Sequence, residues 1–101
     1  MSTKKQSGVG VAEPKTKARP KLDRPRVYKV LLHNDDHNAM DYVVLALLKS
    51  VPDLTIERAS EIMLEAHLTG VGLVTVCPLE HAELYRDRIQ SFGIGATIER
   101  A

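Results

Sequence analysis

The chain has 101 residues, one cysteine and a formal net charge of +1 at neutral pH. This length suits one small domain, and a single cysteine excludes an internal disulfide and fits a reducing compartment. No stretch approaches the roughly 20 apolar residues that span a bilayer. The first residues also lack the apolar core of a secretory signal, so we expect neither a membrane protein nor a secreted one.

Charge divides the chain into a basic N-terminal part and an acidic remainder. Residues 1–26 hold eight Lys or Arg and two acidic residues, whereas residues 27–101 hold six basic and eleven acidic residues. The N-terminal part has no apolar periodicity, so we expect residues 1–25 to be a disordered extension and residues 26–101 the folded domain. The extension could be a solubilising leader, an arm for an acidic protein surface or an arm for nucleic acid. A plastid transit peptide fits less well, because the segment carries acidic residues.

Apolar periodicity predicts the element order βααβαβ for the domain. The predicted elements, in chain order, are a strand at 27–32, helices at 40–51 and 56–69, a strand at 71–76, a helix at 79–91 and a strand at 96–99. So few strands with three helices favour a small α/β sandwich, in which a three-stranded sheet packs on three helices.

Capping residues predict where the first two helices begin and end. Asn38 is suited to cap the first helix, with Asp41 completing a capping box, and Thr55 is suited to cap the second helix. Gly70 is expected to end that second helix. Its inner stripe is predicted to consist of Ile56, Ala59, Met63 and Ala66.

A polar cluster, residues 33–38 with the sequence HNDDHN, lies between the first strand and the first helix. Plain turn chemistry is one explanation, because Asn and Asp favour turns. His67 borders the inner face of the second helix near its end. If the first two helices pack side by side, Asn34, Asp35 and His67 can meet at the rim of an apolar pocket. The floor of that pocket would consist of Met40, Val43, Met63 and Ala66.

The three rim side chains together match an ammonium group. An amide oxygen, a carboxylate oxygen and a neutral imidazole nitrogen offer three acceptors and one negative charge. An ammonium offers three donors and one positive charge, and charge-assisted hydrogen bonds are the strong ones. The methionines are adaptable and suit an apolar side chain of variable shape. The residues therefore predict a site for a free peptide N-terminus whose first side chain is bulky and apolar.

Four segments of the chain closely resemble the ClpS family, namely residues 28–36, 40–43, 57–59 and 63–67. This family is the adaptor of the Clp protease and the bacterial counterpart of N-end-rule recognition proteins. The resemblance extends over about residues 25 to 101 and implies the βααβαβ fold with a flexible N-terminal extension. It implies an adaptor, not an enzyme, that delivers proteins with a first Phe, Leu, Trp or Tyr to a hexameric AAA+ unfoldase, ClpA or ClpC. We expect a cytoplasmic bacterial monomer with no cofactor, metal, nucleic acid or membrane partner.

The resemblance also assigns roles to individual positions. The α-amino group would be held by Asn34, Asp35 and His67, and the peptide backbone by Asp36 and Asn38. The hydrophobic pocket would consist of the gatekeeper Met40 with Val43, Met63, Ala66 and Ile94. The unfoldase would contact Glu80 and Tyr85 on the third helix.

The chain departs from the common family pattern at several of these places. His37, Asn38 and Ala39 stand where an aromatic residue, Thr and Pro are common. Ala66 replaces a usual Val, and Tyr85 replaces a usual Lys. These changes leave the three α-amino contacts intact, but they leave open which bulky residue fits and which unfoldase docks. A specialised paralogue fits this pattern.

Two other classes of function remain open. An enzyme could use Asp35 or Asp36 with His67 as an acid–base pair or as metal ligands, but no Ser or Cys nucleophile lies nearby in the sequence. A small RNA-binding or ribosome-associated module is the other alternative. The basic N-terminal segment could contact phosphate, and the small α/β fold resembles the C-terminal domain of the ribosomal stalk protein, although the domain itself is acidic.

Overall fold

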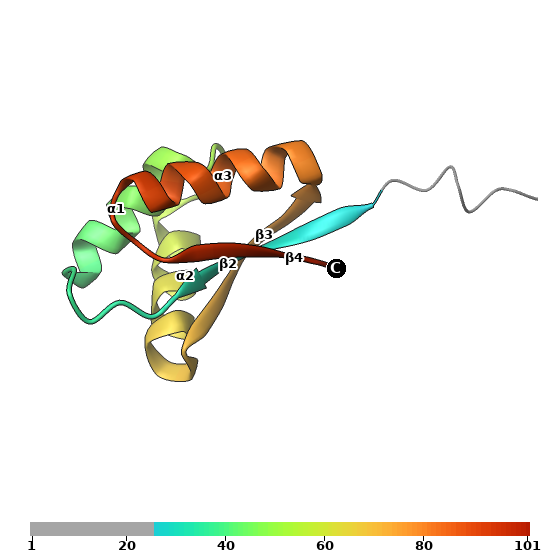
Figure 1. Cartoon of the computed structure of the whole chain (residues 1–101). Coiled ribbons are helices and arrows are strands. Elements are labelled where there is room, and N and C mark those ends of the chain that lie inside the picture. The colour runs from blue at the N-terminus through green and yellow to red at the C-terminus, as the bar shows by residue number, and fades with distance from the viewer. Residues whose placement is uncertain (1–25) are drawn as a thin grey trace, which may run out of the picture.

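The computed structural model describes residues 26–101, and the predicted extension at residues 1–25 lies outside the described part. The elements, in chain order, are β2 (Val27–His33), α1 (Met40–Ser50), α2 (Ile56–Thr69), β3 (Val71–Pro78), α3 (Leu79–Ser91) and β4 (Ala96–Arg100). This βααβαβ order confirms the predicted α/β fold class (Figure 1). The predicted boundaries agree with the observed ones to within two residues.

The three strands form one antiparallel sheet in the order β3-β2-β4, so the first strand of the domain is the central one. Along β2, Val30 and Leu32 are buried, whereas Leu31 between them is only half-buried. Successive side chains of a strand point to opposite faces, so this alternation shows that one face of the sheet carries the core. In Figure 1, α3 runs along the sheet with β4 and β2 beside it.

The core joins the sheet to all three helices. Val30 and Leu32 of β2, Leu47 of α1, Ile62 of α2 and Ile89 of α3 are each no more than 1% exposed. Burying a side chain of this size contributes about 1.5–3 kcal/mol relative to leaving it in water. Each helix is therefore packed against the same sheet, which also fixes the position of the loops at the helix ends.

The predicted cap of α1 is wrong. Ala39 occupies the capping position, and it makes no side-chain capping hydrogen bond. The Asn38 side chain instead donates to Asp35, and the Asp41 carboxylate accepts from the backbone N–H of Tyr42. The Asn38 side chain is therefore bonded within the polar cluster and does not cap the helix.

The predicted ends of α2 are confirmed. Thr55 Oγ1 accepts from the backbone N–H of Arg58 at 3.1 Å, and Gly70 ends the helix in the left-handed conformation at φ 97°. The inner stripe of α2 differs from the prediction at its start. Ile56 is 64% exposed, because the helix contacts the core only from its second turn onward, where Ile62 is completely buried.

A glycine allows α2 to lie close to the backbone of β3. A Cβ atom placed on Gly72 would meet the carbonyl oxygen of Ile62 at 2.5 Å and the backbone nitrogen of Ala66 at 3.2 Å. Both neighbours are main-chain atoms of α2, which cannot rotate away as a side chain can. The absence of a side chain at Gly72 therefore sets how near the helix, and with it His67, approaches the sheet.

Candidate functional site

A cavity with an open mouth lies between the end of β2, the start of α1 and the last turns of α2. Its lining combines hydrogen-bonding groups on one side with apolar side chains on the other. The lining residues are Leu32, His33, Asn34, Asp35, Asn38, Met40, Val43, Met63, Ala66 and His67. The structure thus brings the three predicted α-amino contacts together with four of the five predicted pocket residues.

The fifth pocket residue and three other predicted positions lie elsewhere. Ile94 is 3% exposed in the core and is not part of the cavity lining. Asp36 lines a second, more open hollow that adjoins the cavity and also involves Gly93. Glu80 and Tyr85 lie on α3, Glu80 exposed and Tyr85 half-buried, and neither lines either space.

Sequence reasoning missed two of the lining residues. Leu32 is the last fully buried residue of β2, and because Leu31 beside it is also a leucine, the sequence does not show which of the two faces the helices. His33 ends β2, where its backbone N–H donates to the carbonyl of Gly95 at 3.0 Å. Its ring nitrogen Nε2 lies 2.7 Å from Thr97 Oγ1 on β4. This pair fixes the strand end from which the polar cluster begins.

The Asp35 carboxylate organises the polar cluster. Its Oδ1 accepts from the backbone N–H of His37 at 2.7 Å and from that of Asn38 at 3.0 Å. Its Oδ2 accepts from the Asn38 side chain at 2.6 Å. The same Asn38 amide lies 3.4 Å from the carbonyl of Gly93, which precedes β4. Asp35 is therefore held in one orientation by the loop that follows it.

These donors hold the pKa of the Asp35 carboxyl below its ordinary value of 3.8. The Asn38 side chain is the largest cause of the lowered pKa. Burial is the next largest effect and acts in the opposite direction, and the backbone N–H groups of His37 and Asn38 lower the pKa further. The group is therefore a carboxylate throughout the neutral range. A carboxylate offers about four acceptor positions, so three donors leave it one position for a ligand.

Asn34 connects the polar cluster to the end of α2. Its backbone N–H donates to the carbonyl of Gly70 at 3.0 Å, and Gly70 follows His67 by three residues. Its side-chain nitrogen donates to Asp36 Oδ1 at 3.3 Å. That bond uses the donor side of the amide, so the amide oxygen is left as an acceptor for a ligand.

The apolar side of the cavity narrows from an exposed rim to a buried wall. Met40 at the start of α1 is 45% exposed, whereas Val43 and Ala66 are 5% and 2% exposed. Met63 is half-buried and packs against the core. The small Ala66 side chain leaves space at the buried end, and a flexible methionine at the rim can adjust to the shape of what enters.

Removing the Asn38 amide is expected to raise the pKa of Asp35 toward 3.8. A carboxyl with a lowered pKa in the folded state stabilises that state above the ordinary pKa, and this contribution is lost as the pH falls through the lowered value. In Asn38→Ala the contribution should be smaller and should be lost at higher pH. Carbon-13 NMR titration of the Asp35 carboxyl measures this directly. Gln90→Ala, which removes an amide from α3, should leave the titration in place, and an unmoved Asp35 in Asn38→Ala would refute the assignment.

Within residues 26–101, no three His, Cys, Asp or Glu side chains converge in a way that could hold a metal ion. None of the three described helices is both long and apolar enough to cross a membrane.

Comparisons with known proteins agree on one family. The family model described as "ATP-dependent Clp protease adaptor protein ClpS" matches residues 23–97. An ATP-dependent Clp protease adapter protein ClpS from Synechococcus elongatus is 47% identical over 89 residues, which cover 88% of this chain and 92% of that protein. A chloroplastic adapter protein, CLPS1 from Chlamydomonas reinhardtii, is 50% identical over 76 residues, covering 75% of this chain and 47% of that protein.

A solved structure extends the likeness to three dimensions. The structure of Agrobacterium tumefaciens ClpS2 bound to L-phenylalaninamide matches with a TM-score of 0.72 and 27% sequence identity, covering 77% of this chain and all of that one. The family match covers the whole described domain except its last residues, and the relatives share almost half of their sequence with it. The chain therefore belongs to the ClpS family of adaptor proteins of the ATP-dependent Clp protease.

Proposed function

We propose that this chain binds the free N-terminus of proteins that begin with a bulky hydrophobic residue and delivers them to a Clp-type AAA+ unfoldase for degradation. The observation that carries the proposal is the junction of a fixed carboxylate, Asp35, with an apolar cavity bounded by Ala66 and Val43. Phenylalaninamide, the ligand in the structure of the Agrobacterium relative, has a free α-amino group next to an aromatic side chain.

Recognition of the α-amino group follows from the free acceptors of the cavity. The three N–H donors of an ammonium match three acceptors, namely the remaining position of Asp35, the side-chain oxygen of Asn34 and a neutral imidazole of His67. Only Asp35 among these carries a formal charge opposite to that of the ligand. An acetylated N-terminus has neither the charge nor three donors, so it should be rejected.

Recognition of the first side chain depends on the apolar part of the cavity. An aromatic or branched side chain entering past Met40 would displace water from Val43, Met63 and Ala66, which favours binding in proportion to the apolar area covered. We assign Asp36 and Asn38 to the peptide backbone, because Asn38 lines the cavity and Asp36 lines the hollow that adjoins it. Ile94 is buried in the core, and we assign it a supporting role in the apolar part of the site.

The delivery step requires a second surface. Glu80 and Tyr85 lie on α3, outside the cavity, and we assign this helix to the contact with the unfoldase, ClpA or ClpC. The basic residues of 1–25 would engage the unfoldase during transfer. We further propose that the protein acts as a monomeric binding protein in the bacterial cytoplasm and catalyses no reaction itself.

Deleting residues 1–25 is expected to spare peptide binding but to stop delivery. The experiment measures degradation of a reporter with a first Leu or Phe by the AAA+ protease, beside peptide affinity for the same variant. A full-length chain with Asp35→Ala serves as the control that should lose both. Loss of peptide affinity in the deletion variant would contradict the assignment of peptide binding to residues 26–101 alone. Unchanged degradation would contradict a role of residues 1–25 in delivery.

A further inference from the structure

The outer edge of β3 has the composition of a strand that pairs readily with another chain. β3 is an edge strand in the order β3-β2-β4, and residues 71–77 read VGLVTVC, without a charged residue. Unpaired N–H and C=O groups along such an edge form a template for a further strand. Segments of this length with high β-propensity and no charge are the usual sites of strand addition and aggregation.

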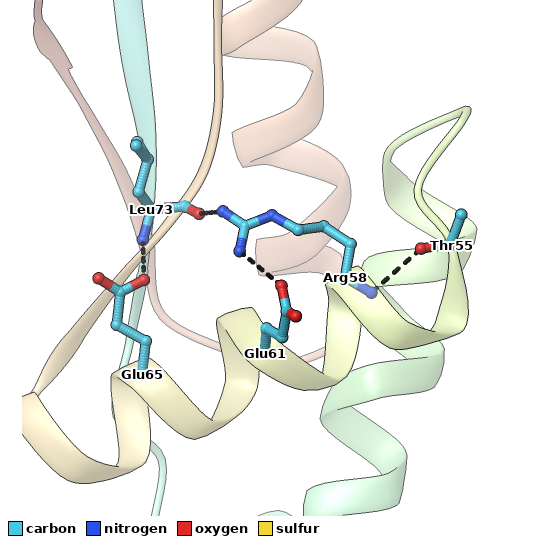
Figure 2. A network of polar contacts seen from close by, with 5 residues as sticks. All are labelled: Thr55, Arg58, Glu61, Glu65 and Leu73. Atoms are coloured by element: carbon cyan, nitrogen blue, oxygen red, sulfur yellow. Dashed lines mark hydrogen bonds and ion pairs between the residues drawn. The ribbon is translucent and has the colours of Figure 1, made fainter.

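Side chains of α2 occupy those backbone groups. Glu65 Oε1 accepts from the backbone N–H of Leu73 at 3.1 Å, and Arg58 Nη2 donates to the carbonyl of Leu73 at 3.2 Å, as Figure 2 shows. Thr69 Oγ1 lies 2.9 Å from the carbonyl oxygen of Val71 and 2.7 Å from that of Glu65, so its single hydroxyl proton is shared between these two acceptors. The main-chain groups that a second strand would use at Leu73 are therefore already bonded.

The spacing along α2 explains how one helix reaches the length of the edge. Arg58, Glu65 and Thr69 are separated by seven and four residues, which places them on one face of the helix. Arg58 is held in turn by Glu61, whose Oε1 lies 3.2 Å from its Nη1 (Figure 2). Arg58, Glu65 and Thr69 do not line the binding cavity, so peptide binding does not explain these contacts.

The backbone of β3 adds a second obstacle at the same place. The pairing of β2 with β3 shifts between Val30 and Leu31, whose partners are Thr75 and Leu73, so Val74 has no partner across the strands. An extra residue of this kind is a β-bulge, which bends and twists the strand locally. The bulge follows directly after Leu73, the residue that α2 holds on both sides.

We propose that Arg58, Glu65 and Thr69 form an edge guard that prevents β3 from pairing with the β3 strand of a second copy of this chain. A second copy is the fitting occupant, because two antiparallel β3 edges related by a two-fold axis present the same groups to each other. No charge on residues 71–77 opposes that pairing. The guard concerns self-association and is independent of peptide binding.

The test is the double variant Arg58→Ala/Glu65→Ala in the full-length chain. Arg86→Ala/Asp87→Ala is the matched control, because it also removes one arginine and one acid joined at 3.0 Å, but from α3. Sedimentation velocity over a concentration series should show monomers for the wild type and the control and dimers for the double variant. Hydrogen exchange of the Leu73 amide should be about tenfold faster in the dilute double variant than in the wild type. It should slow again at high concentration, when the edge is paired.

The opposite results overturn the proposal. One such result is a double variant that stays monomeric at every concentration, and another is a dimer whose Leu73 amide still exchanges rapidly. Either result would show that the guard does not prevent pairing through the β3 edge. If the double variant does not fold, Glu65→Gln and Glu65→Met replace it. Glutamine keeps an acceptor for Leu73 and should remain monomeric, whereas methionine has similar length without a comparable acceptor and should dimerise. Equal behaviour of these two variants would also overturn the guard.

Discussion

Replacing Asp35 with alanine is expected to weaken the binding of a free N-terminal peptide by about a hundredfold or more. The change removes the one formal negative charge in the cavity lining, so the bound ammonium would lose its countercharge. It also removes the acceptor of the His37 and Asn38 donors, so the loop before α1 would lose its internal bonds. Titration of a fluorescent peptide by anisotropy measures the loss.

Asp35→Asn separates these two causes. The asparagine oxygen can still accept from the backbone of the loop, but the side chain carries no charge, so most of the affinity should be lost without a change in fold. Asp87→Ala removes a carboxylate from α3 and should bind like the wild type. Unchanged affinity in Asp35→Asn would mean that the countercharge of the ammonium comes from another group.

Replacing Gly72 with alanine is expected to lower the free energy of unfolding by about 3 kcal/mol. The new Cβ would lie 2.5 Å from the carbonyl oxygen of Ile62, so α2 must move away from β3 or the strand must bend. For a domain of this size the melting temperature should fall by about 10–20 °C. Thermal and denaturant unfolding, followed by circular dichroism, measure the change.

Gly95→Ala is the control for the loss of a glycine as such. A Cβ at that position would meet only the His33 Cβ, at 3.4 Å, so the substitution should be nearly neutral. Both substitutions reduce the freedom of the unfolded chain equally, and their difference therefore reports the clash at α2. A Gly72→Ala variant as stable as Gly95→Ala would show that the close approach of α2 to β3 contributes nothing.

The order and limits of the elements could be predicted because local signals agreed with one another. Gly70 and Thr55 each have a single plausible role at a helix end, and both have it in the structure. The cap of α1 could not be predicted in the same way, because several polar residues compete there. Asp35 accepts three donors at once, and two of them are the backbone N–H and the side-chain amide of Asn38. Asn38 is therefore bonded to Asp35 and does not cap the helix.

Helical periodicity indicates a stripe but not where the helix meets its neighbours. Ile56 continues the stripe of Ala59, Met63 and Ala66 by spacing, yet it is exposed. The fully buried Ile62 lies one residue from Met63 and belongs to the same broad face. Which of these side chains enters the core depends on the position of β3, which no local pattern contains.

The candidate site could be predicted in its polar part and less fully in its apolar part. Asn34 and His67 are far apart in sequence, and their proximity depends on the bond between Asn34 and Gly70. That proximity was predicted on the condition that the first two helices pack side by side, and α1 and α2 are in contact in the structure. Ile94 was implied only by the family resemblance, and the structure places it in the core and not in the cavity lining.

The central claim is that the cavity binds a free α-amino group. The measurement is fluorescence anisotropy with labelled peptides that begin with Leu, Phe, Tyr, Trp, Ile, Arg or Ala, together with an N-acetylated copy of the best binder. We expect micromolar or tighter binding of some peptides that begin with a bulky hydrophobic residue, and loss of that binding on acetylation. Equal binding of the acetylated copy, or no binding to any bulky start, would contradict the claim.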